Sequence, residues 1–159
     1  GWNAIEHEQL GLAFPPIKER ADLMEDQLAL LHGLWGEPDG WSHEGITGIK
    51  LHGALFRPRP VDVAGRPRTP VGGARPRIIV GGQGSSRSFR LAARYADEFN
   101  LPFVDEETTR AQFDRVRRAC EEIDRDPATL AVSVHIWKAD AATSGARRVD
   151  LLAGYREMA

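Results

Sequence analysis

A glycine-rich turn between an apolar run and an amphipathic helix holds the residues whose spacing best fits chemistry. The β-branched run over residues 78–80 predicts a short strand covered on both faces. Glycine allows the sharp turn that follows, and Ser85 or Ser86 suits the N-cap of the next helix. Backbone amides and the positive end of the helix dipole would meet here and bind a phosphate group. The candidate phosphate-binding residues are Gly81, Gly82, Gln83, Gly84, Ser85, Ser86 and Arg87.

The same turn also fits a purely structural role, as a tight strand-to-helix connection without a ligand. Its glycines make a poor dinucleotide-binding fingerprint, because Arg87 stands where that motif needs a third glycine. Arg87 itself has two interpretations. Its guanidinium group would pair with a phosphate or a carboxylate of a cofactor, or it is an exposed arginine in the first turn of the helix.

Length, charge and cysteine content narrow the class of protein. A chain of 159 residues is long enough for one domain with a core and too short for two. The net charge of -2 predicts no nucleic-acid partner, and the apolar runs are too short for a membrane span. The single Cys120 excludes an intrachain disulfide, and without a signal-peptide pattern we expect a cytoplasmic protein. The histidines lack metal-ligand spacing, so no metal site is expected.

Apolar periodicity predicts alternating helices and strands. A stripe of apolar residues spaced three or four apart predicts one buried helix face: Ile17, Ala21, Met24, Leu28, Leu31 and Trp35. The segment 58–75 is rich in Pro and Gly and is predicted to be an exposed, flexible loop. The order of elements indicates parallel strands with helical crossovers, and therefore an α/β fold. Helices are expected over residues 17–35, 86–97, 106–124 and 144–158, and extended segments over residues 41–49, 51–56, 78–80, 98–101 and 130–137.

The last predicted strand alternates between a branched and a more polar face. In a (β/α) barrel the branched face would meet the helices and the other face would point into the lumen. This assignment places Ser133 and His135 inward. His135 is thus a candidate catalytic or ligand-binding residue, although a single strand histidine also fits a structural position in the core or rim.

Several stretches resemble one known family. The strongest is IVGGQG at residues 79–84 with LAARYAD at residues 91–97 and Asn100. Further matches are GWN at residues 1–3, EH at residues 6–7, FPPIKERAD from residue 14 and RDP at residues 125–127. Together they resemble the luciferase-like monooxygenase family, particularly its flavin- or deazaflavin-dependent oxidoreductases.

The resemblance implies a fold, a cofactor and a reaction. Residues 1–159 would form a single domain, the C-terminal half of a (β/α)8 TIM-type barrel with about strands five to eight and their helices. The cofactor would be FMN or the deazaflavin coenzyme F-420, with its phosphate on Gly81–Ser86. The paired glycines and the helix after them favour the deazaflavin. The reaction would be hydride transfer, or oxygen activation, on a small organic substrate.

A second interpretation is non-catalytic. A partial barrel exposes strand edges and apolar lumen, which favour pairing with another chain. The protein would then be a structural half-barrel that self-associates or binds a partner. Under either interpretation we expect a homo-oligomer or association with an N-terminal half.

Overall fold

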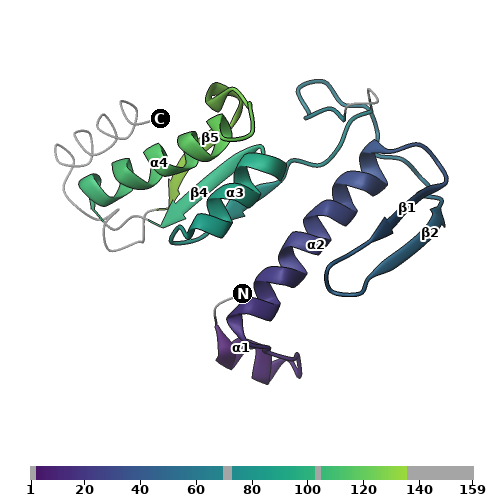
Figure 1. Ribbon diagram of the computed structural model, residues 1–159, viewed down its shortest axis with the longest axis horizontal. Coiled ribbons are helices and arrows are strands. Elements are labelled where there is room, and N and C mark those ends of the chain that lie inside the picture. The colour runs from purple at the N-terminus through teal and green to yellow at the C-terminus, as the bar shows by residue number, and fades with distance from the viewer. Residues whose placement is uncertain (1–2, 70–72, 103–104, 136–159) are drawn as a thin grey trace. The chain divides into compact units, whose positions relative to one another are not determined.

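The computed structural model describes residues 3–69, 73–102 and 105–135 (Figure 1). The chain divides into two compact units, Gly1–Arg75 and Pro76–Ala159. The predicted helix 144–158 and the last two residues of the predicted strand 130–137 lie outside the described residues. A single domain over residues 1–159 and flexibility of the loop 58–75 stay predictions.

The first unit contains two helices and a β-hairpin (Figure 1). A short helix that the sequence pattern did not predict, α1 (Ala4–Gln9), begins where Asn3 Oδ1 accepts a hydrogen bond from the Ile5 amide at 3.2 Å. The predicted helix is present as α2 (Ile17–Gly36). The two predicted extended segments are the antiparallel strands β1 (Trp41–Glu44) and β2 (Lys50–Ala54).

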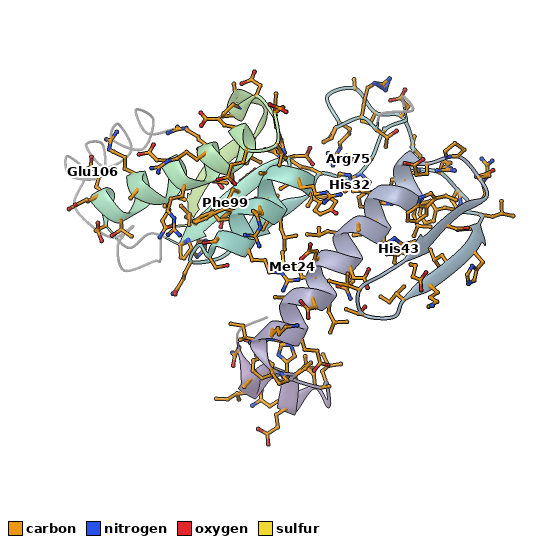
Figure 2. The ribbon with its side chains drawn as sticks, in the orientation of Figure 1. Met24, His32, His43, Arg75, Phe99 and Glu106 are labelled. Atoms are coloured by element: carbon orange, nitrogen blue, oxygen red, sulfur yellow. The ribbon has the colours of Figure 1, made fainter. Side chains whose placement is uncertain are left out.

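The buried face of α2 differs from the predicted stripe. Of that stripe only Leu28 is buried, while Ile17 is 77% exposed. The hairpin instead packs against the part of α2 that contains Asp26 and Gly33. The Trp41 ring occupies the space that a side chain at position 33 would fill, so this position requires glycine. Figure 2 shows His43 of β1 on the side of the hairpin that faces α2, where it contacts Asp26. A small residue and a polar partner, rather than apolar periodicity, therefore decide which face is covered.

The described part of the segment 58–75 contains no helix or named strand. Val61 is 80% exposed, as expected for a surface loop. The segment nevertheless closes on itself, because Arg68 and Ala74 form an antiparallel bridge and Thr69 and Ala74 are buried. The prediction of an exposed loop is therefore only partly correct, since Thr69 and Ala74 are buried while Arg66, Arg68 and Gly73 are exposed.

The second unit is an α/β structure built on a parallel sheet. The elements are β3 (Ile79–Gly81), α3 (Ser86–Tyr95), β4 (Glu98–Pro102), α4 (Glu106–Glu121), the 3-10 turn η1 (Pro127–Thr129) and β5 (Ala131–His135). The strands form a three-stranded parallel sheet in the order β3-β4-β5. This confirms the predicted α/β class and the helical crossovers. The described strands do not close into a barrel.

Two helices and one face of the sheet form the core of this unit (Figures 1 and 2). Val80, Phe99 and Leu101 on alternate strand positions are at most 2% exposed. Ile79 precedes Val80 in β3, so its side chain lies on the opposite face of the sheet, where it is 55% exposed. The prediction of a strand covered on both faces is therefore wrong, because among the described residues the helices cover one face only. From the helices the core takes Phe89, Leu91, Ala92, Ala93 and Tyr95 of α3, and Phe113, Val116, Ala119 and Cys120 of α4.

Polar side chains set the helix ends. Asp105 caps α4, because its Oδ1 accepts from the Thr108 amide at 2.7 Å. The helix ends at Glu121, three residues earlier than predicted, and Asp124 has a φ of +57°. Ile123, which lies beyond this helix end, is consequently 49% exposed. Arg125 then donates from Nη1 to the Ala93 and Ala96 carbonyl oxygens, at 2.8 and 2.9 Å, and closes the end of α3.

Candidate functional site

The glycine turn connects the carboxyl end of β3 to the first residue of α3, as predicted. Ser85 is the N-cap, with its Oγ accepting from the Ser88 amide at 3.2 Å. The Ser88 Oγ accepts in return from the Ser85 amide at 2.7 Å. This reciprocal capping box satisfies two of the amides at the start of the helix and holds the turn in place.

The turn is open to solvent. Residues 81–83, 85 and 86 are exposed and Gly84 is half-buried. In the described part of the chain, the backbone N–H groups of Gln83, Gly84 and Ser86 have no hydrogen-bond acceptor. Unpaired amides at a helix N-terminus are the groups that hold phosphate in many proteins. The residues present therefore fit a phosphate group of a cofactor.

Gly84 and Gly82 of the turn differ in the space around their α-carbons. Gly84 has a φ of +80°, and a Cβ there would lie 2.6 Å from Phe89 Cζ and 2.7 Å from Gln112 Oε1. Gly82 has a φ of +148°, with nothing within 4 Å of a Cβ. Gly84 is therefore required for packing against the helices, whereas Gly82 leaves open space beside the turn.

The face of the sheet away from the helices carries a polar chain of three residues. Asn100 Nδ2 donates to Ser133 Oγ at 2.7 Å, and the Ser133 hydroxyl donates to Glu98 Oε1. The other oxygen of Glu98 is 2.8 Å from Arg77 Nη2. The predicted orientation of Ser133, opposite to Val132 and Val134, is confirmed by this contact and by its register with Asn100.

The glycine turn and the polar chain lie near the carboxyl end of the parallel strands. Gly81, Asn100 and Ser133 are in register across the three strands. His135 lies two residues further along β5, exposed and opposite Pro102. Because neighbouring strands are about 4.8 Å apart, β3 and β5 are separated by about 10 Å. The predicted phosphate turn and the candidate His135 thus lie at the same carboxyl end of the parallel strands, while the role of His135 stays a prediction.

Arg87 and Glu98 lie beside the candidate site, the first predicted as part of it and the second not. Arg87 is half-buried in the first turn of α3, beside the candidate phosphate site. The polar chain through Glu98 was not predicted, although strict alternation along β4 places Glu98 on the same face as Asn100. Among residues 3–69, 73–102 and 105–135, no group of three or more His, Cys, Asp or Glu side chains is placed to hold a metal ion.

Comparison with known proteins identifies the family. The family described as luciferase-like monooxygenase matches residues 1–158. The chain belongs to the luciferase-like monooxygenase family. The resemblance drawn from the glycine turn and the helix after it is thereby confirmed for nearly all of this luciferase-like chain. No curated protein sequence matches it.

Solved structures similar to this luciferase-like chain share its fold. They include an F-420-dependent secondary alcohol dehydrogenase with an F-420–acetone adduct (TM-score 0.60, 16% identity), a riboflavin lyase with modified FMN and riboflavin (0.57, 17%) and the EDTA monooxygenase of Chelativorans sp. BNC1 (0.53, 21%). The matches cover 77%, 80% and 84% of this chain but 33%, 30% and 34% of those proteins, so the chain spans about a third of their length. Within its described residues, no helix has the length and apolar character to cross a membrane.

Proposed function

We propose that this luciferase-like chain forms part of a flavin- or deazaflavin-dependent oxidoreductase, with the cofactor phosphate on Gly81–Ser86. The observation that carries this proposal is the exposed turn at the carboxyl end of β3, whose amides lack acceptors in the described part of the chain. The similar solved proteins described above with F-420 or FMN support the choice of cofactor class. In the proposed fold, β3, β4 and β5 belong to the second half of a TIM-type barrel.

The remaining roles follow from the position of each residue. The turn amides and the Arg87 guanidinium group would hold the phosphate, because both match an anion in charge and geometry. Asn100, Ser133 and His135 lie on the sheet face beside the turn and would contact the cofactor ring or a small organic substrate. When bound, the ring supplies hydride transfer or oxygen activation, and the protein contributes position and electrostatics.

Titration of the full chain with FMN, F-420 and riboflavin, followed by absorbance and fluorescence, tests the phosphate site. Riboflavin has no phosphate, so we expect it to bind at least tenfold more weakly than FMN if FMN is the cofactor. Ser86→Asp adds a negative charge to the turn and should weaken binding of the phosphate-bearing cofactors about tenfold. The same charge at a helix N-terminus favours the helix, so the variant should remain folded.

Ser86→Asn is the matched control, since it has nearly the same shape and no charge. It should bind FMN or F-420 within about twofold of the unchanged chain. Circular dichroism of both variants establishes that they are folded. Equal weakening by Asp and Asn, or binding of neither FMN nor F-420, would contradict the proposed phosphate site.

A second candidate function is a non-catalytic half-barrel that pairs with another copy of the chain or with an N-terminal half. The 55% exposure of Ile79, on the sheet face opposite the buried Val80, favours it. Sedimentation analysis of the full chain and of Ile79→Lys tests this candidate. It predicts a dimer that the lysine substitution dissociates, together with no binding of FMN or F-420.

A further inference from the structure

A pocket lies in the groove between α3 and α4 of the second unit. Its volume is about 250 Å³. Three arginines dominate its wall, and we call it the arginine pocket. The lining residues are Ser86, Phe89, Arg90, Arg115, Arg118, Ala119 and Glu122.

The arginine pocket has an excess of positive charge. Its lining residues include three arginines and one acidic residue, Glu122. Other arginines of this unit are paired, for example Arg77 with Glu98 at 2.8 Å and Arg117 with Asp114 at 3.4 Å. None of the three pocket arginines forms an ion pair with a residue in the described part of the chain. Anionic groups are therefore the ligands that this pocket would attract.

One of the arginines is held in place by an aromatic ring. The guanidinium carbon of Arg115 lies 4.9 Å from the centre of the Phe89 ring, a cation–π arrangement. Phe89 is 3% exposed and belongs to the core, so its ring is a fixed surface. A guanidinium group resting on such a ring loses less side-chain freedom when it binds an anion than one on a free side chain.

The arginine pocket is continuous with the glycine turn. Ser86 is the last residue of the candidate phosphate site and also part of the pocket wall. A ligand whose phosphate rests on the turn can therefore extend into the pocket. The volume of about 250 Å³ is below the range of about 300–1,000 Å³ typical of sites for whole ligands. The pocket thus suits a segment of a ligand rather than a complete cofactor.

We propose that the arginine pocket binds the oligoglutamate tail of the deazaflavin coenzyme, an inference that rests on the proposed function. FMN ends at its phosphate. The deazaflavin coenzyme continues beyond its phosphate into a chain of glutamates, each of which carries a carboxylate. Guanidinium groups match carboxylates through paired hydrogen bonds. The three pocket arginines have no ion pair in the described part of the chain, and the pocket that they line includes Ser86 of the phosphate turn. The pocket therefore selects the cofactor with the longer, anionic tail.

Fluorescence titration of the full chain with two forms of the coenzyme tests this inference. One form carries several glutamates, and the other ends before the first glutamate. We expect the form with glutamates to bind about tenfold more tightly at low salt, since each exposed ion pair contributes a modest amount. Raising the salt concentration should remove most of the difference, because exposed charges are screened.

Variants of the pocket arginines test whether the tighter binding of the form with glutamates depends on this pocket. Arg115→Gln combined with Arg118→Gln should abolish the gain from the tail and leave binding of the tail-free form within about twofold. Replacement of both residues by Lys keeps the charge and should retain part of the gain. Arg117→Gln removes the same charge from α4 outside the pocket and is the control. Circular dichroism verifies that each variant is folded.

The outcomes separate the two proposals. Equal affinity for both forms of the coenzyme, or an equal loss in Arg117→Gln, overturns the assignment of the arginine pocket and leaves the phosphate site intact. Failure of FMN and of both coenzyme forms to bind overturns the proposed function and this inference with it. Tail-dependent affinity that disappears only in the pocket variants supports both.

Discussion

The Nδ2 atom of Asn100 lies 2.7 Å from the Oγ atom of Ser133, and this hydrogen bond joins β4 to β5 on the sheet face away from the helices. Ser133 uses its own proton to donate to Glu98. The hydroxyl group therefore has a fixed orientation, and so does the amide group that donates to it. An ordered polar surface results beside the glycine turn, where the cofactor ring or substrate is proposed to bind.

Removal of this hydroxyl group should weaken the second unit. Ser133→Ala leaves the half-buried Glu98 and Asn100 without their shared partner, so we expect a loss of about 1–2 kcal/mol in the free energy of unfolding. Urea denaturation followed by far-UV circular dichroism measures it. In a double-mutant cycle with Asn100→Ala the two losses should not add, because both changes remove the same bond. Strict additivity would show that the hydrogen bond contributes nothing.

Alanine at the two glycines of the turn should have unequal effects. Gly84→Ala places a Cβ 2.6 Å from Phe89 Cζ at a φ of +80°, so crowding adds to backbone strain. Each of these two effects costs about 1–3 kcal/mol. Gly82→Ala meets no atom within 4 Å and should cost backbone strain alone. Thermal denaturation of both variants measures the difference, and a Gly82 variant that is less stable than the Gly84 variant contradicts the expected order.

Asp26 should stabilise the first unit in a pH-dependent manner. It is buried and accepts from the Thr47 amide at 3.0 Å and from His43 Nε2 at 2.9 Å. The hydrogen bonds from Thr47, and then that from His43, hold the pKa of Asp26 below its usual value of 3.8, although burial opposes them. The folded state therefore binds this proton more weakly than the unfolded chain. The contribution is complete above pH 3.8 and is lost as the pH falls through the lower folded pKa.

Asp26→Asn tests this contribution. At pH 7 the variant should be less stable by about 2 kcal/mol, because it lacks the charged acceptor. The difference from the unchanged chain should shrink as the pH falls below 3.8. Asp22→Asn is the control on the same helix, since its ion pair with the 85% exposed Lys18 should contribute about 0.5 kcal/mol or less. If the loss of stability in Asp26→Asn is the same at pH 7 and pH 3, the charged Asp26 carboxylate does not stabilise the folded state as proposed.

The single cysteine should report opening of the second unit. Cys120 is fully buried, and burial raises the pKa of its thiol, so little thiolate is present at neutral pH. We expect a disulfide reagent to label it at least a hundredfold more slowly in the folded chain than in urea. Ala111→Cys combined with Cys120→Ala moves the thiol to an exposed position on α4 and should react rapidly. Equally rapid labelling of both chains would show that α4 does not shield Cys120.

Local signals predicted much of the second unit and less of the first. Ser85 caps the helix that its position predicts, because a cap depends on a few neighbouring residues. The alternation along β5 placed Ser133 on the face where it lies. The early end of α4 and the exposure of Ile79 were not predicted. The end of α4 lies just before the turn at Asp124, after which Arg125 contacts the end of α3. The exposure of Ile79 depends on which sheet face the helices cover.

By itself the sequence determined the α/β class, the glycine turn with its helix N-terminus and the membership of the luciferase-like family. The first two features follow from backbone preferences and apolar periodicity over a few consecutive residues. The family membership follows from the match of the sequence to the family. Only the tertiary structure decided that Asp26 is buried against the hairpin, that Glu98 joins Ser133 and Asn100, and that the arginines of α3 and α4 line one pocket. Each of these depends on contacts between residues that are distant in the chain, and no short-range pattern encodes such contacts.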